Sequence, residues 1–369
     1  MKINIPFVNF KKQWLSEKNE ITKIVGKIYE RGIFVNGPEV DIFEKKIISN
    51  FMYKDCVALN SGTDALTLGL MSVGVRKGDE VITPPNSFVA STGSIIHIGA
   101  KPIFADVLQN QLIDPKKIEE KITKKTKAIM TVHLSGAMSN IEQLKIISKK
   151  YNIPLIEDAA QSIGSSFKSV MSGSWGNVGC FSAHPLKNLN ASGDAGFIVT
   201  KQKKNLQNLR LMRNHGLENR DKLKYFGYVS RMDVLQAAIL NFRLEKINQV
   251  ISRRRSNAKL YKSLLNDCDI FIPEEIEGEF HTYHNYIIQT RKRDKLRNYL
   301  SENGIETLIH YKIPIHLQNG ARFLGYKKGM FPVAEKQAKE ILSLPIHQFL
   351  TRQDIEYVSS KIKKFLKNN

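Results

Sequence analysis

The sequence predicts an α/β protein with two units, a large one built on a mostly parallel β-sheet and a smaller C-terminal one. Between about residues 55 and 200, short β-rich runs alternate with helical patterns. Such alternation is typical of a parallel sheet covered by helices on both faces. After about residue 231 the pattern changes, and 369 residues are too many for one hydrophobic core. We therefore expect a large domain over 1–240 and a small domain over 241–369, with an N-terminal segment that can pack on the small one.

The elements follow from apolar runs and helix-start signals. We expect buried strands at 56–59, 80–83, 102–105, 128–132 and 154–157. Asp114-Pro115 marks the start of a helix over 116–122, and Ile141, Leu144 and Ile147 share one face of a helix over 141–150. In the second unit we expect one long or two consecutive helices over 232–264, a strand over 283–290, and helices over 293–303 and 354–366.

Composition excludes several classes of protein. Residues 1–10 lack a basic region followed by an apolar core, and no window approaches the ~20 apolar residues of a membrane span. Cys56, Cys180 and Cys268 show no CxxC pairing. We therefore expect no secretion signal, no transmembrane segment and no metal site, and we predict a cytoplasmic protein with reduced thiols.

The formal charge of +21 has several possible meanings. Lys and Arg are scattered through amphipathic segments, and the densest run, 253–255, lies in a predicted helix. This pattern indicates solvated basic faces. Attraction to an anionic small substrate or to an acidic membrane surface are the alternatives, and we do not expect nucleic acid as a partner.

Three segments carry candidate chemistry. The first is Ser61-Gly62-Thr63-Asp64, directly after the strand 56–59. Gly62 permits a tight turn, and a helix that begins here presents unpaired N–H groups, to which the Thr63 hydroxyl can add a bond. Such a helix start can bind phosphate. The alternative is a simple helix cap.

The second segment ends a strand with two acids, Glu157 and Asp158. Ligands in this architecture bind beyond the carboxyl ends of the strands, and a carboxylate there can pair with a protonated ring nitrogen of a cofactor. The alternative is that either acid caps the following helix.

The third segment runs from Gly179 to Leu189 and is followed by a glycine-rich turn. A short strand leads into a loop with Ser182, His184 and Lys187, and the lysine has the apolar neighbour Leu186. A lysine in such surroundings can have the lowered pKa that a Schiff-base amine needs. Taken alone, a lysine is usually a solvated surface residue.

These three segments, in this order, resemble the DegT/DnrJ/EryC1/StrS family of pyridoxal-phosphate (PLP)-dependent aminotransferases that act on nucleotide-linked sugars. The resemblance covers nearly the whole chain, with further matches at 34–38, 77–82, 99–102, 230–238, 309–311 and 314–316. It implies fold type I, the aspartate aminotransferase-like fold, and a PLP/PMP cofactor. It also implies a homodimer with active sites at the interface.

The resemblance implies individual roles. Lys187 matches the Schiff-base lysine that also moves the proton between cofactor and substrate. Asp158 matches the acid that faces the pyridine nitrogen, and Gln161 the amide near the phenolic oxygen. Gly62, Thr63 and Ser182 match positions around the phosphate. Phe88 matches the aromatic residue whose ring stacks on the cofactor. No role is assigned to His184.

At two positions the sequence departs from the family pattern, and three further residues are weaker candidates for substrate binding. Val229 replaces an Asn that commonly reaches the partner's cofactor phosphate, so another group must substitute or the phosphate is held less tightly. Ala183 replaces a bulkier residue, which leaves a roomier pocket. Arg231 and the pair His310-Tyr311 are candidates for substrate binding, with a salt bridge at a helix start and a loop packing pair as alternatives.

The predicted reaction is transfer of an amino group, from glutamate, to a keto-deoxysugar on a nucleoside diphosphate, for surface glycan or O-antigen precursors. One alternative is the PMP-dependent sugar dehydratase branch of the family, which replaces the lysine, typically with His. Lys187 argues against it. Another alternative is a non-catalytic regulatory relative that works through its basic surface.

Overall fold

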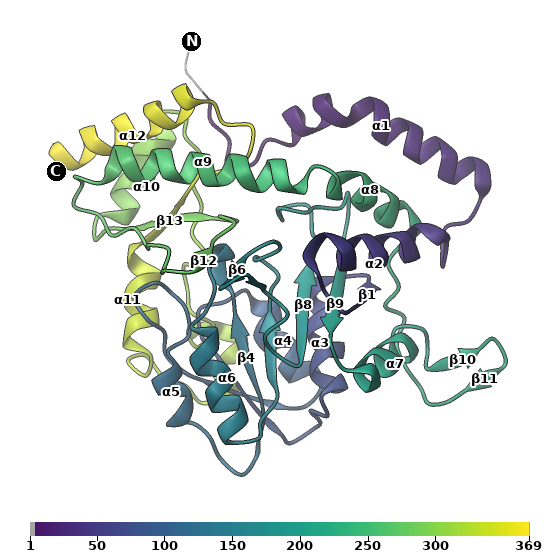
Figure 1. Cartoon of the computed structure of the whole chain (residues 1–369). Coiled ribbons are helices and arrows are strands. Elements are labelled where there is room, and N and C mark those ends of the chain that lie inside the picture. Colours follow the sequence, from purple (N-terminus) through teal and green to yellow (C-terminus); the bar gives the residue numbers. More distant parts are fainter. Residues whose placement is uncertain (1–3, 369) are drawn as a thin grey trace.

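The computed structural model describes residues 4–368 and forms an α/β architecture around one seven-stranded sheet (Figure 1). Residues 1–3, which belong to the segment where we expect no secretion signal, and residue 369 lie outside the described residues. The helices are α1 (Phe10–Arg31), α2 (Pro38–Phe51), α3 (Gly62–Ser72), α4 (Val89–His97), α5 (Pro115–Glu119), α6 (Ile141–Lys150), α7 (Lys203–Met212), α8 (Val234–Leu244), α9 (Ile247–Leu265), α10 (Arg293–Glu302), α11 (Pro332–Glu340) and α12 (Arg352–Lys367).

The central sheet has the order β1-β9-β8-β5-β4-β2-β3. Its strands are β1 (Asp55–Leu59), β2 (Glu80–Thr83), β3 (Lys101–Phe104), β4 (Thr126–Val132), β5 (Leu155–Asp158), β8 (Val178–Ser182) and β9 (Gly196–Thr200). All neighbours from β8 to β3 are parallel, whereas β9 is antiparallel to both β1 and β8. The expected mostly parallel sheet is thus confirmed, with β9 as the one reversed strand.

Helices bury both faces of this sheet, because its strands alternate apolar side chains between two cores. Val57 and Leu59 of β1 pack in a core with α3 and α7, whereas Cys56 and Ala58 pack in a core with α2 and α8. Helix α6 covers β4 and β5 on the second face, and its predicted stripe Ile141, Leu144 and Ile147 is buried. Because helices cover both faces of the sheet, a ligand can reach it at the carboxyl ends of the parallel strands.

The C-terminal unit packs around a short antiparallel pair, β13 (Tyr286–Gln289) and β14 (Ile341–Leu344). Its core joins α10, α12 and the second half of α9, and it includes Ile5, whose backbone pairs with Ile305. Helix α9 spans both units, because Ile247 and Ile251 pack with α2 and α8 while Tyr261 and Leu265 pack in the C-terminal core. The domain boundary near residue 240 stays a prediction.

Several expected elements differ in extent. The helix expected over 116–122 ends at Glu119, whereas the region 232–264 forms two consecutive helices, α8 and α9, which was one of the two expected arrangements. Helices α1 and α2 had no signal in our reading, and both pack against α8. Helix α12 begins with a capping box, in which Thr351 and Asp354 exchange side-chain and backbone hydrogen bonds.

Small strands complete the fold: β6 (Ser166–Phe167), β7 (Val170–Met171) and β12 (Glu279–Phe280) form one sheet, and β10 (Leu217–Asn219) and β11 (Lys222–Leu223) form a hairpin. This hairpin projects from the body of the molecule near α7 (Figure 1). None of the helices within residues 4–368 combines the length and the apolar character that a membrane crossing requires.

Candidate active site

A cavity of about 380 Å³ opens where the carboxyl ends of β1, β5 and β8 meet the C-terminal unit. Nine of the ten residues predicted for the site line it, and they are Gly62, Thr63, Phe88, Asp158, Gln161, Ser182, Lys187, His310 and Tyr311. Residues that are more than 200 positions apart in the chain therefore meet in one place. The tenth, Arg231, does not line the cavity, and its guanidinium hydrogen-bonds Asn214 at 3.1 Å.

The start of α3 forms one wall. Ser61 caps the helix by accepting a hydrogen bond from the N–H of Asp64 at 3.1 Å. The N–H groups of Gly62 and Thr63 have no partner in the helix, because they lie in its first turn. A Cβ on Gly62 would lie only 2.5 Å from Cβ of Ser182. Gly62 is therefore needed for close approach to the end of β8, rather than for the tight turn that we expected.

Asp158 ends β5 and is buried at the floor of the cavity. Its Oδ2 accepts a hydrogen bond from the Ser91 hydroxyl at 2.7 Å, and its Oδ1 accepts one from the N–H of Ala160 at 3.2 Å. Burial raises the pKa of this carboxyl above its ordinary value, although both hydrogen bonds and the Lys187 charge oppose the shift. Ser91, on α4, fixes the carboxylate orientation and had no signal in the sequence.

The preceding acid, Glu157, has a different function. It is fully buried and accepts hydrogen bonds from the backbone N–H groups of Gly173, Trp175 and Gly176 at 2.6–2.8 Å. It also contacts Nε2 of His133 at 2.9 Å. Because Nδ1 of that histidine accepts the N–H of Ser139, Nε2 is the donor to Glu157. Glu157 thus holds the turn before β8 and caps no helix.

Lys187 lies in the loop after β8, with its backbone N–H bonded to the carbonyl of His184 at 2.8 Å. The side chain is partly buried in the cavity wall, and this desolvation lowers the pKa of the amine to about 8, whereas the attraction of Asp158 opposes the shift. A substantial fraction of the amine is therefore neutral near pH 7–8, which an ordinary exposed lysine is not. A neutral amine is the form that can act as a nucleophile.

Two residues from the C-terminal unit, His310 and Tyr311, close the cavity, and Tyr311 contacts Gln161 of the large unit. Gln161 accepts a hydrogen bond from the N–H of Ser135 at 2.7 Å and contacts the Tyr311 hydroxyl at 3.3 Å through its amide nitrogen. The Tyr311 ring lies 6.0 Å from that of Phe88 between ring centroids. Burial and the Lys187 charge lower the pKa of His310 to about 4, so this ring is neutral at physiological pH.

The lining residues that the sequence did not indicate include three polar ones from the second half of the chain: Arg254, His284 and Asn285. Arg254 belongs to the run 253–255, which we interpreted as a solvated basic face. That interpretation is wrong for Arg254, which is 6% exposed, because α9 turns it inward between its two exposed or partly exposed neighbours. Helical periodicity could have indicated it, since Arg254 shares a face with the apolar Ile251 and Ala258.

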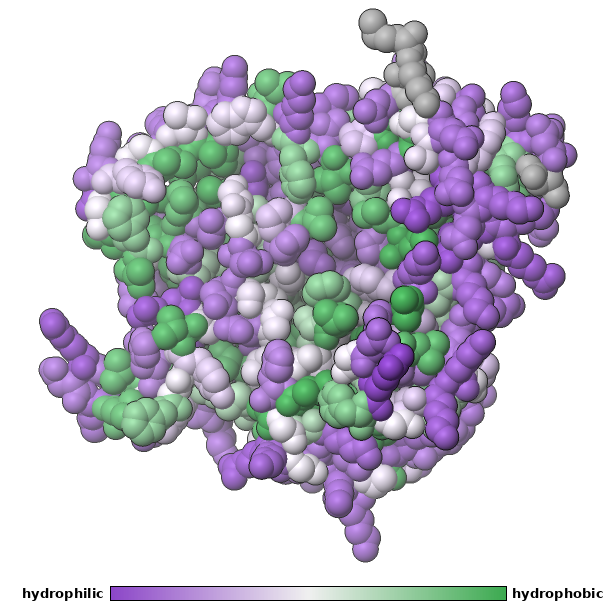
Figure 2. Space-filling model, turned by 180° about the vertical axis from the view of Figure 1, so that it is seen from behind, coloured by the Kyte–Doolittle hydropathy of each residue, from purple (hydrophilic) through white to green (hydrophobic). Residues whose placement is uncertain are grey.

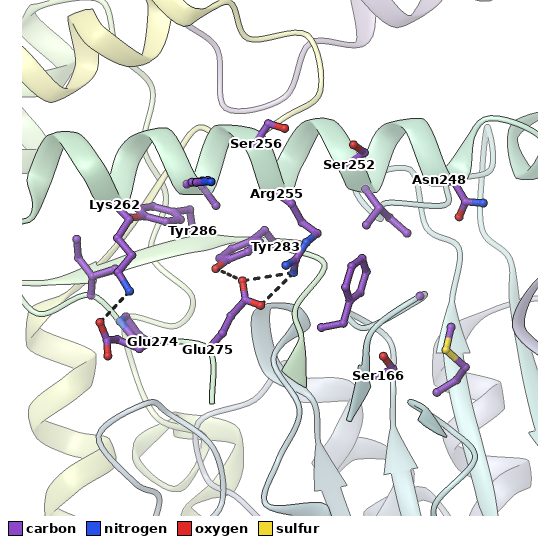
Figure 3. A pocket seen from close by; sticks show the side chains of 18 of the residues that line it. Ser166, Asn248, Ser252, Arg255, Ser256, Lys262, Glu274, Glu275, Tyr283 and Tyr286 are labelled. Carbon is purple, nitrogen blue, oxygen red and sulfur yellow. Dashed lines mark hydrogen bonds and ion pairs between the residues drawn. The ribbon is translucent and has the colours of Figure 1, made fainter. Parts of the chain in front are cut away.

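A second cavity, of about 780 Å³, lies between α9 and the segment 272–286 and contains none of the predicted site residues (Figure 3). Arg255 points into it and pairs with Glu275 at 3.1 Å, and the Tyr283 hydroxyl donates to the same carboxylate at 2.6 Å. Although it is larger, both acids in this cavity are already paired, Glu275 with Arg255 and Glu274 with Lys262. The smaller cavity combines a lysine of lowered pKa with a buried acid, and we therefore assign the chemistry to it.

The fold and this cavity define the class: an α/β enzyme whose active site lies at the carboxyl ends of parallel strands. The chain belongs to the DegT/DnrJ/EryC1/StrS aminotransferase family, whose model matches residues 15–363. The family expected from the sequence is thus confirmed, and with it the aspartate aminotransferase-like fold type.

Individual relatives match over nearly their full lengths. A "Pleiotropic regulatory protein" of Geobacillus stearothermophilus is 37% identical, over 99% of this chain and 100% of the relative. The dTDP-3-amino-3,6-dideoxy-α-D-galactopyranose transaminase of Aneurinibacillus thermoaerophilus is 36% identical, over 98% and 99%.

Solved structures also match most of the chain. S. venezuelae DesV in complex with a ketimine intermediate has a TM-score of 0.96 at 31% identity, over 99% of both chains. NtdA from Bacillus subtilis, with bound cofactor PMP, has a TM-score of 0.89 at 30% identity, over 95% of this chain and 82% of that one.

Proposed function

We propose that this protein is a PLP-dependent aminotransferase that moves an amino group from glutamate to a keto-deoxysugar on a nucleoside diphosphate. The product would serve the synthesis of surface glycan or O-antigen precursors in the cytoplasm. The observation that carries the proposal is Lys187, an amine with a pKa of about 8 in the same cavity as the buried carboxylate of Asp158. Family membership and the transaminase and PMP-bound relatives support it.

The residues of the cavity fit this cofactor. The free N–H groups of Gly62 and Thr63, at the positive end of the α3 dipole, together with the Ser182 hydroxyl, can hold its phosphate. The buried Asp158 carboxylate can pair with the protonated ring nitrogen of the cofactor. The positive charge of that nitrogen would stabilise the carboxylate and so offset the effect of burial, which raises the pKa of Asp158. Phe88, 55% exposed beside the cavity, offers an apolar ring for stacking, and Gln161 an amide for the phenolic oxygen.

Lys187 has two tasks in this proposal. Its neutral Nζ would hold the cofactor, and the same amine would take and return the proton at the substrate carbon. A group with a pKa near the working pH suits both directions of proton transfer. Bound PLP would supply an aldehyde, whose carbon carries the amino group between substrates, and a ring that accepts electrons.

The test of the proposal is an absorbance titration of the purified protein. Addition of PLP should produce the visible band of an amine-bonded cofactor, and glutamate without any sugar should shift this band to shorter wavelength as PMP forms. Borohydride reduction before glutamate should leave the cofactor fixed to the protein. If PLP gives no band, the aminotransferase proposal fails.

The pKa of Lys187 predicts the pH dependence of cofactor capture. The ammonium dominates below pH 8 and the neutral amine above it, so the rate of capture should rise with pH and level off just above about 8. Stopped-flow mixing of the apo-protein with PLP from pH 6 to 11 would measure this. A rate that keeps rising towards pH 10.5, as for an exposed lysine, would contradict the assignment.

We further propose a homodimer that completes each active site. Large apolar side chains are exposed beside the cavity and along one edge of the molecule, and they include Phe88, Leu186, Trp14, Tyr29, Phe34, Phe226 and Val229. Hydrophobic atoms are visible among polar ones along the edge that carries α1 and the β10–β11 hairpin (Figure 2). Exposed apolar surface of this extent is typical of a protein–protein interface.

Sedimentation should therefore give a mass twice that of one chain. Phe226→Glu, which places a charge on a side chain that is 91% exposed, should shift the equilibrium to monomers and weaken PLP binding. Phe323→Glu is the matched control, because Phe323 is also strongly exposed but belongs to the 3₁₀ helix Asn319–Leu324 outside this edge. A monomeric parent that binds PLP fully would refute the dimer.

A regulatory, non-catalytic role is the second candidate, since one relative carries a regulatory name. The presence of Lys187 in a fitted cavity favours catalysis over this candidate and over the lysine-free dehydratase branch. The same PLP and glutamate titration separates all three, because only the aminotransferase both fixes the cofactor and consumes glutamate.

A further inference from the structure

Arg254 is a buried cation without an acidic partner among residues 4–368. It is 6% exposed, and none of the ion pairs in this part of the chain includes it. Burial lowers the pKa of its guanidinium to about 10. A buried charge without a counterion is costly, so its retention beside the active-site cavity indicates an anion that arrives with a ligand.

The hydrogen bonds of Arg254 leave one edge of the guanidinium open. Its Nη1 donates to the backbone carbonyls of Tyr283 and His284, both at 3.1 Å. Its Nε is buried without a partner, and Nη2 makes no hydrogen bond with the described residues. Nε and Nη2 form the side of the planar fork that can hold both oxygens of a carboxylate.

Two neighbours share this unmet hydrogen-bonding capacity. Nδ1 of His284 and Nδ2 of Asn285 are also buried without partners, and both residues line the same cavity as Lys187. Burial and the charges of Lys187 and Arg254 hold the pKa of His284 well below its ordinary value, so its ring is neutral. Unsatisfied polar atoms are rare in protein interiors, and three in one wall of a cavity point to a polar ligand group.

We propose that Arg254, with His284 and Asn285, binds a carboxylate of the amino donor and so orients its amine towards Lys187. This inference rests on the proposed aminotransferase function and extends it to the donor. The start of α3 already offers donors for the cofactor phosphate, so Arg254 is not needed there. A single, deeply buried cation with a planar fork suits a carboxylate better than the diphosphate of a nucleotide sugar, which carries more charge.

The test measures donor affinity without the sugar. In Arg254→Lys, the glutamate concentration that half-converts the PLP band should rise roughly ten- to hundredfold, the range for a lost hydrogen-bonded charge pair. The unreactive dicarboxylate glutarate should lose a similar factor in equilibrium binding, measured by calorimetry. PLP affinity should not change, because the cofactor contacts lie elsewhere.

Arg255→Lys is the matched control, since Arg255 is the next residue of α9 but faces the second cavity and pairs with Glu275 (Figure 3). It should leave both donor measurements unchanged. If Arg254→Lys also leaves them unchanged, the inference is overturned while the aminotransferase function stands. Absence of a PLP band in the parent would instead overturn the function.

A third measurement needs no variant, because loss of the Arg254 Nη1 hydrogen bonds to the 283–284 backbone could itself disturb the fold. In the unsubstituted protein, glutarate should compete with glutamate, whereas its neutral diamide, glutaramide, should not. Equal competition by the two compounds would overturn the carboxylate pairing.

Discussion

Replacement of Lys187 by alanine should abolish covalent capture of PLP and reduce amino transfer by at least about a hundredfold to ten-thousandfold, the range expected for loss of one proton-transfer group. The physical reason is that no other described lysine lines the cavity. Borohydride reduction followed by mass spectrometry should find the cofactor mass on the parent protein and not on the variant.

The control for this variant is Lys168→Ala. Lys168 is exposed and pairs with Glu142 at 2.8 Å, so its loss should change neither cofactor capture nor rate. Cofactor that is still fixed by borohydride in Lys187→Ala would show that another amine does the chemistry, and the role of Lys187 would then be wrong.

Asp158→Asn should retain the fold and bind PLP, but slow the glutamate half-reaction by roughly a hundredfold to a thousandfold, as for removal of one electrostatic contact in a dry site. The amide keeps the shape and the Ser91 hydrogen bond, yet it cannot neutralise a protonated ring nitrogen. Because Asp158 also attracts the Lys187 ammonium, the pH midpoint of cofactor capture should fall below that of the parent.

Comparison with the neighbouring variant Glu157→Gln separates a residue that acts in catalysis from one that stabilises the fold. Glu157 accepts three backbone N–H groups and contacts His133, so the amide leaves buried donors facing an NH₂ group. We expect a loss of about 1–3 kcal/mol in the free energy of unfolding for one such unmet donor, seen by chemical denaturation. Asp158→Asn should be nearly as stable as the parent. Equal stability losses would mean that Asp158 also has a structural role.

Local patterns were sufficient for much of the site. Asp158 ends a strand, Ser61-Gly62-Thr63 starts a helix and Lys187 follows a strand, and each property is encoded within about ten residues. Strand–helix alternation predicted the parallel sheet, and a parallel sheet brings the carboxyl ends of its strands to one edge. The order of the three segments then sufficed to identify the family.

Other features had no local signal. Ser91 orients Asp158 from α4, and Tyr311 reaches Gln161 across 150 positions of the chain. The sequence singled out Asp158 but gave no structural role to Glu157, because the backbone donors that Glu157 accepts come from the packing of the 173–176 turn. Helix α1 gave only a weak apolar pattern because two of its four buried residues, Gln13 and Glu17, are polar, whereas α2 carries an apolar stripe that we did not recognise. Their common partner, α8, lies far along the chain from both.

The sequence by itself determined the order of the main strands and helices, because backbone propensity and apolar periodicity act over short stretches of chain, and the resemblance of its motifs to a known family gave the family and nine residues of the cavity. Only the tertiary structure decided which charges are buried. Arg253, Arg254 and Arg255 are identical in type and adjacent, yet Arg254 alone faces the active-site cavity while Arg255 pairs with Glu275. The cost of burying a charge depends on what surrounds it, and those surroundings come from segments far apart in the chain.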